Sequence, residues 1–292
     1  MPTFLYAASL ADAQTVPAPT LTVEAEYGTV VVEGSLYTAA HHQPSGPFER
    51  CVHPAPCNDT DIPVVPDEAT VLVSHFDLDT AAGCLRALPG FEGLFAPEHD
   101  AFWRLAEDVD LNGAHKVRHL GGSEQDVLRL HAYWAWARAD VPRFPREGVH
   151  DVTVHVLAAG RVLTSILAGE ASALTRGREF MADEDGLNTR SFVRLQDGVI
   201  MRSVSDPRDF VNHLYTTPEG VLARAVITLN TGAGSVTVSL ADPVPGVSCR
   251  DMVQGLWGPE AGGHPGIAGS PRGQAMTEAD AEAALQALLS LI

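Results

Sequence analysis

Apolar and polar positions follow two different patterns along the chain. Up to about residue 181, short apolar runs of strand length alternate with longer stretches in which apolar residues recur at helical spacing. Beyond that point, short β-branched runs separated by turn residues predominate. The patterns predict a two-domain α/β protein: a domain with a mainly parallel sheet and flanking helices at 1–148, a connecting helix at 149–185, and a smaller α/β domain at 186–292.

The first domain contains several elements that the pattern places individually. Leu21–Glu26 alternates apolar and polar residues, Thr29–Gly34 is β-branched, and the Tyr27-Gly28 break between them predicts a hairpin. The run Val71–Val73 predicts a further strand. Helices are expected at Thr80–Leu88, from about Pro97 to Asn112, and at 124–138.

The second domain is expected to be built from four strands and three helices. The strands are Ser191–Leu195, Gly198–Ser203, Ala223–Leu229 and Ser235–Leu240. The helices are expected near Pro207–Leu214, Ser248–Leu256 and Thr277–Leu291, the last of them clearly amphipathic.

Candidate chemistry is concentrated where the Val71–Val73 run meets the Ala-rich Thr80–Leu88. His75, Asp77 and Asp79 occupy alternate positions there, so in continued strand geometry they point to one side, about 6.6 Å apart. One imidazole and two carboxylates suit Mn²⁺, Mg²⁺ or Zn²⁺, and two carboxylates could serve a pair of ions. We therefore expect these three side chains in one metal sphere. The alternative is that one aspartate is only the N-cap of the following helix.

Other ionisable residues could extend such a site. Glu33 ends a predicted strand and precedes the paired histidines His41 and His42, whose neutral imidazoles are ligands or proton carriers. Paired loop histidines are also common as simple exposed residues. Asp108 and Asp110 lie at a predicted helix C-terminus, where negative charge is unfavourable, which favours a nearby cation. The alternative is that both are exposed charges at a helix end.

The net charge and the cysteines limit the class of protein. With 37 acidic and 19 basic residues, the net charge of −18 argues against a broad basic surface for duplex DNA, whereas a nucleotide held through metals remains compatible. Four scattered cysteines do not make a disulfide framework, so we expect a reducing cytoplasm. The spacing of Cys51, His53 and Cys57 matches no familiar zinc pattern. We expect no membrane span and no targeting segment.

A second stretch of chemical interest, 258–269, is rich in glycine. Gly262 and Gly263 allow a backbone to approach an anion, His264 adds a donor, and Arg272 adds a nearby positive charge. The same composition is also typical of an ordinary flexible loop.

Together the two stretches resemble the DHH phosphoesterase superfamily with a DHHA1-type C-terminal domain. Residues 74–79 match its His-x-Asp-x-Asp signature, and 262–269 match its Gly-Gly-His…Ala-Gly loop. The motif order is altered, because the family's Asp-His-His triplet normally follows the His-x-Asp-x-Asp stretch. Here the paired histidines precede it, with Ala40 in place of the acid.

The resemblance implies a metal-dependent phosphoesterase that hydrolyses a phosphodiester or phosphomonoester of a nucleotide or short single-stranded nucleic acid. It implies two Mn²⁺ or Mg²⁺ ions held by a set of six ligands: His75, Asp77, Asp79, Glu33, His41 and Asp110. His42 would donate a proton or bond a phosphoryl oxygen, and 262–264 with Arg272 would hold the rest of the substrate across the interdomain cleft. If His41 and His42 join the site, the Val30–Glu33 strand should lie close to the Val71–Val73 strand. The competing hypothesis is a non-catalytic nucleotide-binding or regulatory protein on a degenerate fold. Both hypotheses are compatible with a homodimer.

Overall fold

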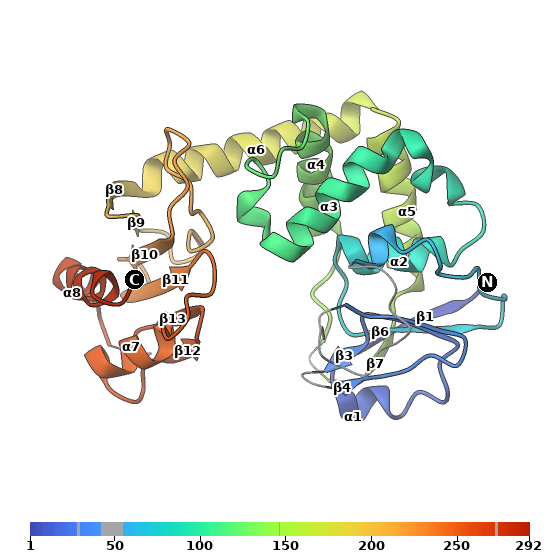
Figure 1. Cartoon of the computed structure of the whole chain (residues 1–292), viewed down its shortest axis with the longest axis horizontal. Helices are drawn as coiled ribbons and strands as arrows, with labels where there is room; N and C mark the ends of the chain where they lie inside the picture. The colour runs from blue at the N-terminus through green and yellow to red at the C-terminus, as the bar shows by residue number, and fades with distance from the viewer. Residues whose placement is uncertain (28–29, 42–54, 146, 272–273) are drawn as a thin grey trace. The chain divides into compact units, whose positions relative to one another are not determined.

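The computed structural model describes residues 1–27, 30–41, 55–145, 147–271 and 274–292. The chain forms two compact units, Met1–Met181 and Ala182–Ile292 (Figure 1). Each unit contains its own sheet and helices, as expected of a two-domain α/β fold.

The first unit is built on a five-stranded sheet in the order β5-β2-β6-β1-β7. Its strands are β5 (Tyr37–Ala39), β2 (Leu21–Val23), β6 (Thr70–Val73), β1 (Thr3–Ala7) and β7 (Val149–Asp151). The first four run parallel and only β7 is antiparallel, so the mainly parallel sheet is confirmed. The carboxyl ends of β2, β5 and β6 therefore meet at one edge of the sheet.

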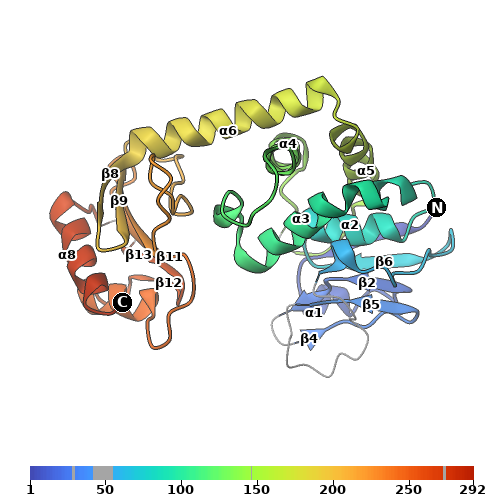
Figure 2. The same ribbon diagram turned by 45° about the horizontal axis from the view of Figure 1, so that its top comes forward.

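The helices of this unit lie mainly on one face of the sheet (Figure 2). They are α2 (Leu78–Arg86), α3 (Asp100–Asn112), α4 (Glu124–Asp140) and α5 (Thr153–Leu167), with short 3₁₀ turns at η1 (Pro56–Asn58), η2 (Glu92–Phe95), η3 (Pro97–His99) and η4 (Ala114–Lys116). The opposite face carries α1 (Leu10–Ala13) and a small ribbon of β3 (Glu26–Tyr27) and β4 (Val30–Val31). Phe102, Trp103 and Leu130 are among the buried side chains between the sheet and the helices.

The close packing of α2 onto the sheet fixes the edge where the strands end. A Cβ added at Gly83 would lie 2.7 Å from Val23 Cγ1, so only glycine allows the helix to approach β2 this closely. Asp77 caps the helix by accepting a hydrogen bond from the Thr80 N–H at 2.9 Å, worth about 1 kcal/mol. The first turn of α2 is thereby held directly beyond the ends of β2 and β6.

The predicted hairpin of Leu21–Glu26 with Thr29–Gly34 was wrong over most of its length. β2 is an inner strand of the main sheet, paired in parallel with β5 and β6, and even its polar residue Thr22 is fully buried. Its alternating pattern resembled a half-exposed strand because the sequence does not reveal that both faces are covered. The antiparallel pairing that does occur joins the two-residue strands β3 and β4.

The predicted single connecting helix was also wrong. The segment consists of β7, α5 and α6 (Ala171–Ser191). Gly169, at a positive φ of 77°, follows the C-cap of α5 and ends that helix, since this backbone conformation suits glycine.

The second unit contains a six-stranded sheet in the order β12-β13-β11-β10-β9-β8. Its strands are β8 (Phe192–Gln196), β9 (Val199–Val204), β10 (Ala225–Asn230), β11 (Ser235–Leu240), β12 (Gly262–His264) and β13 (Ile267–Gly269). The helices α7 (Cys249–Trp257) and α8 (Glu278–Leu289) pack against it through an apolar core. The four predicted strands and these two helices are confirmed within one to two residues.

The helix expected near Pro207–Leu214 does not form. Side chains bind its backbone instead: Ser239 Oγ donates to Asn212 O at 2.7 Å, and Arg202 Nε donates to Leu214 O at 2.9 Å. Arg202 is buried and makes further hydrogen bonds with α6, so this segment is tied to the sheet as irregular structure.

Among the described residues, no single helix combines the length and apolar character of a membrane span. Only α5 and α6 taken together pass that criterion, and they are bent by 93° at their junction.

Candidate metal centre

The site lies at the sheet edge where β2, β5 and β6 end. Glu24 directly follows β2, His41 follows β5 by two residues, and His75 follows β6 by two residues. Asp77 and Asp79 stand at the start of α2, and Asp110 comes from the last turn of α3. We call these six residues the acidic cluster.

Glu24 is the centre of the acidic cluster. Its side chain is fully buried, with Oε1 2.7 Å from His41 Nε2 and Oε2 2.9 Å from His75 Nε2. Thr80 Oγ1 donates a further hydrogen bond to Oε2 at 2.8 Å. The backbone of Glu24 has a positive φ of 49°, which is rare for a residue with a side chain and is typical of functional sites. One carboxylate therefore joins two imidazoles.

The remaining carboxylates complete two overlapping groups. His41 Nε2 lies 3.3 Å from Asp79 Oδ2 and 3.2 Å from Asp110 Oδ2. His75 Nε2 lies 3.3 Å from Asp77 Oδ2. Glu24, His75 and Asp77 form one group and Glu24, His41 and Asp79 another, each with its ligand atoms within 4.8 Å of one another. The shared Glu24 suits a carboxylate that bridges two ions.

His75 and Asp77 belong to one of these groups and Asp79 to the other, with Glu24 common to both, so a single metal sphere for the three stays a prediction. β6 ends at Val73, Asp77 is the extended N-cap of α2, and Asp79 already lies in the helix. Strand alternation therefore does not continue through the motif. The N-cap alternative holds for Asp77, whose Oδ1 caps the helix while its Oδ2 faces His75.

Hydrogen bonds from neighbouring elements fix the buried part of the cluster. Asp79 Oδ1 accepts a hydrogen bond from the Cys57 backbone N–H at 2.7 Å. The Cys57 carbonyl in turn accepts from Arg86 Nε and Nη2 at 3.0 and 2.8 Å. On the other side, Ser74 Oγ donates to Glu24 O and lies 3.0 Å from His75 Nδ1. The side-chain orientations in the acidic cluster are therefore supported by the surrounding polypeptide.

The pKa values reflect this concentration of negative charge. Burial lowers the pKa of His41, but hydrogen bonds with the three carboxylates around it prevail and raise it to about 12. Burial likewise opposes the charge of His75, and its two carboxylate neighbours raise its pKa to about 11. Burial raises the pKa of Asp79 to about 7. Protons on the imidazoles balance part of the charge, and a divalent cation could do so in their place once the imidazoles are neutral.

The donor set fits the expected ions. Carboxylate oxygens suit Mg²⁺ and Mn²⁺, and imidazole nitrogen in addition suits Mn²⁺ or Zn²⁺. The part around His41 and Glu24 is closed, with side-chain exposures of 3% and 0%, whereas His75 and Asp77 are 38% and 48% exposed. Solvent and substrate would therefore reach a bound cation from the side of His75 and Asp77.

The glutamate that the structure places in the acidic cluster is Glu24 and not Glu33. Glu33 is exposed and belongs to neither group found among the described residues. In the sheet β6 lies between β1 and β2, and among the described residues Val30–Val31 pairs with Glu26–Tyr27. Val32 packs against the same apolar cluster as Leu72, so this strand lies close to the Val71–Val73 run without pairing with it. One feature of the sequence could have identified Glu24: it is an acidic residue directly after a short apolar strand. This is visible only if the strand is taken to end at Val23 and not at Glu26.

Several candidate residues lie outside the described part of the chain. These are His42, Arg272, Cys51 and His53. Cys57 is described, and its buried backbone N–H supports Asp79 as given above.

The glycine-rich stretch forms a hairpin in the second unit, with β12 and β13 joined at Pro265-Gly266. Gly263 has a positive φ of 147°, and an added Cβ there would lie 2.5 Å from Ile267 O, so a side chain is excluded. His264 is exposed at the end of β12. The Pro265 carbonyl accepts a hydrogen bond from the Cys249 N–H at the start of α7. The substrate role of Gly262, Gly263 and His264 stays a prediction.

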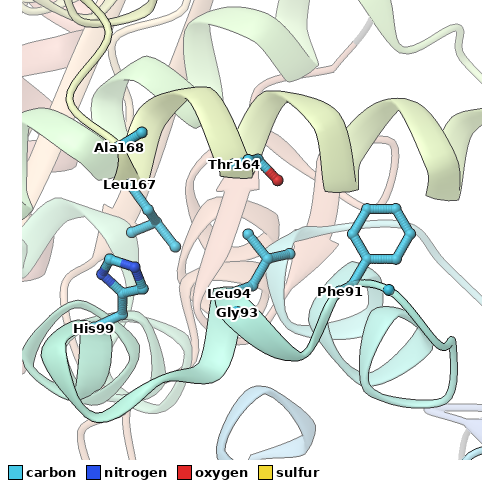
Figure 3. A pocket seen from close by; sticks show the side chains of 8 residues that line it. Phe91, Gly93, Leu94, His99, Thr164, Leu167 and Ala168 are labelled. Atoms are coloured by element: carbon cyan, nitrogen blue, oxygen red, sulfur yellow. The ribbon is translucent and has the colours of Figure 1, made fainter.

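A separate cavity of about 250 Å³ lies between η2–η3 and the end of α5 (Figure 3). Phe91, Leu94 and Leu167 make its wall largely apolar, with His99 and Thr164 as polar residues. None of the acidic cluster lines this cavity.

Comparisons with known proteins add little. No protein-family model matches the chain, and no curated protein matches its sequence. Among solved structures, the pGpG-specific phosphodiesterase PggH from Vibrio cholerae is similar with 13% sequence identity and a TM-score of 0.43. The match covers 77% of this chain and 81% of that protein. This likeness is too weak to establish a shared fold.

Proposed function

We propose that the chain is a metal-dependent phosphoesterase that acts on a nucleotide or a short single-stranded nucleic acid. The observation that carries the proposal is the convergence of four carboxylates and two imidazoles on a sheet edge, five of them in two groups that share Glu24 and the sixth, Asp110, beside His41. The resemblance of 74–79 and 262–269 to DHH phosphoesterases supports the same chemistry.

The residues of the acidic cluster would hold two Mn²⁺ or Mg²⁺ ions, with Glu24 shared between them. When bound, such ions would lower the pKa of a water molecule and neutralise charge on the phosphoryl oxygens. The exposed pair His75 and Asp77 would face the substrate, while the buried residues Glu24 and Asp79 would orient the site. His42 stays the candidate proton donor, and the hairpin with His264 the candidate phosphate contact.

Metal content and turnover test this proposal together. The purified chain is stripped with a chelator, titrated with Mn²⁺ in a calorimeter, and assayed with a generic phosphodiester and a panel of nucleotides and oligonucleotides. About two ions per chain with metal-dependent hydrolysis are expected.

The alternative hypothesis, a non-catalytic nucleotide-binding protein, predicts a different result. The chain would then bind nucleotide without hydrolysis and would take up no Mn²⁺ at saturation. The altered motif order and Ala40 favour this alternative, so the titration decides between the two.

A further inference from the structure

Five rings gather at the same sheet edge, next to the acidic cluster. Tyr6 stacks on Phe144 with centroids 5.1 Å apart and lies 6.2 Å from His150. Phe144 also contacts Phe76 edge-on at 6.1 Å and His155 edge-on at 5.6 Å. We call these residues the aromatic cluster.

The strand register places the aromatic cluster beside the candidate metal centre. Tyr6 pairs with Val73 of β6, which in turn pairs with Val23 of β2, and Glu24 is the next residue. His150 pairs with Tyr6 on the other side. The acidic cluster thus occupies the edge over β5, β2 and β6, and the aromatic cluster occupies the adjoining edge over β6, β1 and β7.

Phe76 connects the two clusters. It lies in the chain between His75 and Asp77, the two exposed members of the acidic cluster. Phe76, Tyr6 and Phe144 are only partly buried, so the rings are not sealed inside the core. They come from a strand, a strand-to-helix turn and the loop after α4, and they converge where a substrate would reach the metal centre from the His75 side.

We propose that the aromatic cluster is the binding site for a nucleobase of the substrate, with the phosphoryl group at the acidic cluster. Partly exposed aromatic rings stack on the π-face of any base, largely independently of sequence. A nucleotide carries its base one sugar away from its phosphoryl group, so adjacent sites for the two parts would select nucleotides over phosphoesters without a base. This inference rests on the proposed function.

The test uses Phe144, because it lies on a loop where a substitution disturbs the fold least. Phe76 is less suitable, since it lies between the candidate ligands His75 and Asp77. The probes are adenosine 5′-monophosphate and ribose 5-phosphate, which differ only in the base, titrated into the Mn²⁺-loaded chain. The wild type is expected to bind the nucleotide about 10-fold more tightly than the sugar phosphate. Phe144→Ala should remove this preference, and leave the affinity for ribose 5-phosphate unchanged.

Further variants keep the test independent of folding. Phe144→Leu retains apolar volume without a ring and should behave as Phe144→Ala, whereas Phe144→Trp should restore the preference. Phe210→Ala removes an exposed phenylalanine of the second unit and serves as the matched control.

The outcomes separate this inference from the proposed function. Equal binding of the two probes to the wild type, or equal weakening of both by Phe144→Ala, overturns the aromatic site and leaves the phosphoesterase proposal intact. It would mean that the rings only cover the end of the sheet. Binding of neither probe by a metal-loaded chain contradicts both.

Discussion

The two halves of the acidic cluster differ in their access to solvent. Glu24, His41 and Asp79 are nearly closed off, and backbone and hydroxyl donors hold the two carboxylates in place. His75 and Asp77 stand open beside the aromatic cluster. A buried carboxylate group is costly without a cation, whereas an exposed group is solvated and can exchange its partners. The buried half should therefore govern metal retention and stability, and the exposed half substrate chemistry.

The largest expected effect comes from Glu24→Gln, which alters the residue shared by both halves. We expect Mn²⁺ affinity and turnover to fall by more than about 100-fold, because each ion would lose a charged ligand. Titration calorimetry and steady-state hydrolysis measure the two quantities. Glu33→Gln, an exposed acid nearby in sequence, is the control and should retain both. Two ions bound with normal affinity by Glu24→Gln would remove Glu24 from the site.

A change in one half should affect only its own ion. Asp77→Asn keeps an oxygen that can cap α2 but loses the negative charge that faces His75. We expect the stoichiometry of Mn²⁺ to fall from about two to about one while the melting temperature of the metal-free chain stays nearly unchanged. Asp77→Ser, which also caps, should give the same result. Loss of both ions would show that the halves act as one site.

Stability against pH should distinguish the buried half. The pKa of Asp79 is raised by burial to about 7, so the folded metal-free chain favours its protonated form. Its ionisation therefore costs stability as pH rises from about 4 to about 7. The melting temperature of the metal-free wild type should fall over this window relative to Asp79→Asn. Saturating Mn²⁺ should abolish the difference by pairing the carboxylate. Parallel curves for the two metal-free proteins would contradict the assignment.

The smallest effect is expected from His264→Ala in the second unit. Its exposed imidazole at the end of β12 can donate to a phosphate, so substrate binding or turnover should weaken by about 10-fold. Metal content and melting temperature should not change, since His264 lies outside the acidic cluster. Unaltered kinetics would make the hairpin purely structural, and a matching loss of Mn²⁺ would move His264 into the metal shell.

Some residues of the site are neighbours in the sequence and could be found from it, whereas others come from distant segments and could not. His75, Asp77 and Asp79 could be found because a strand end and a helix start place them within five positions of the chain. Glu24 and Glu33 cannot be told apart by their local sequence, because each is a glutamate that follows a short apolar run. Which of the two is buried depends on strand order, and no local pattern reports strand order.

The sequence by itself determined the α/β class, the strands of the second unit and the central His-x-Asp-x-Asp motif, since periodicity and short spacing encode these features locally. Only the tertiary structure decided that β2 lies between β5 and β6, and with it that Glu24 and His41 reach Asp79. It also brought Asp110 from α3 to the same point. These placements depend on parallel pairing and helix packing between segments far apart in the chain, whose energies come from burial shared by many residues.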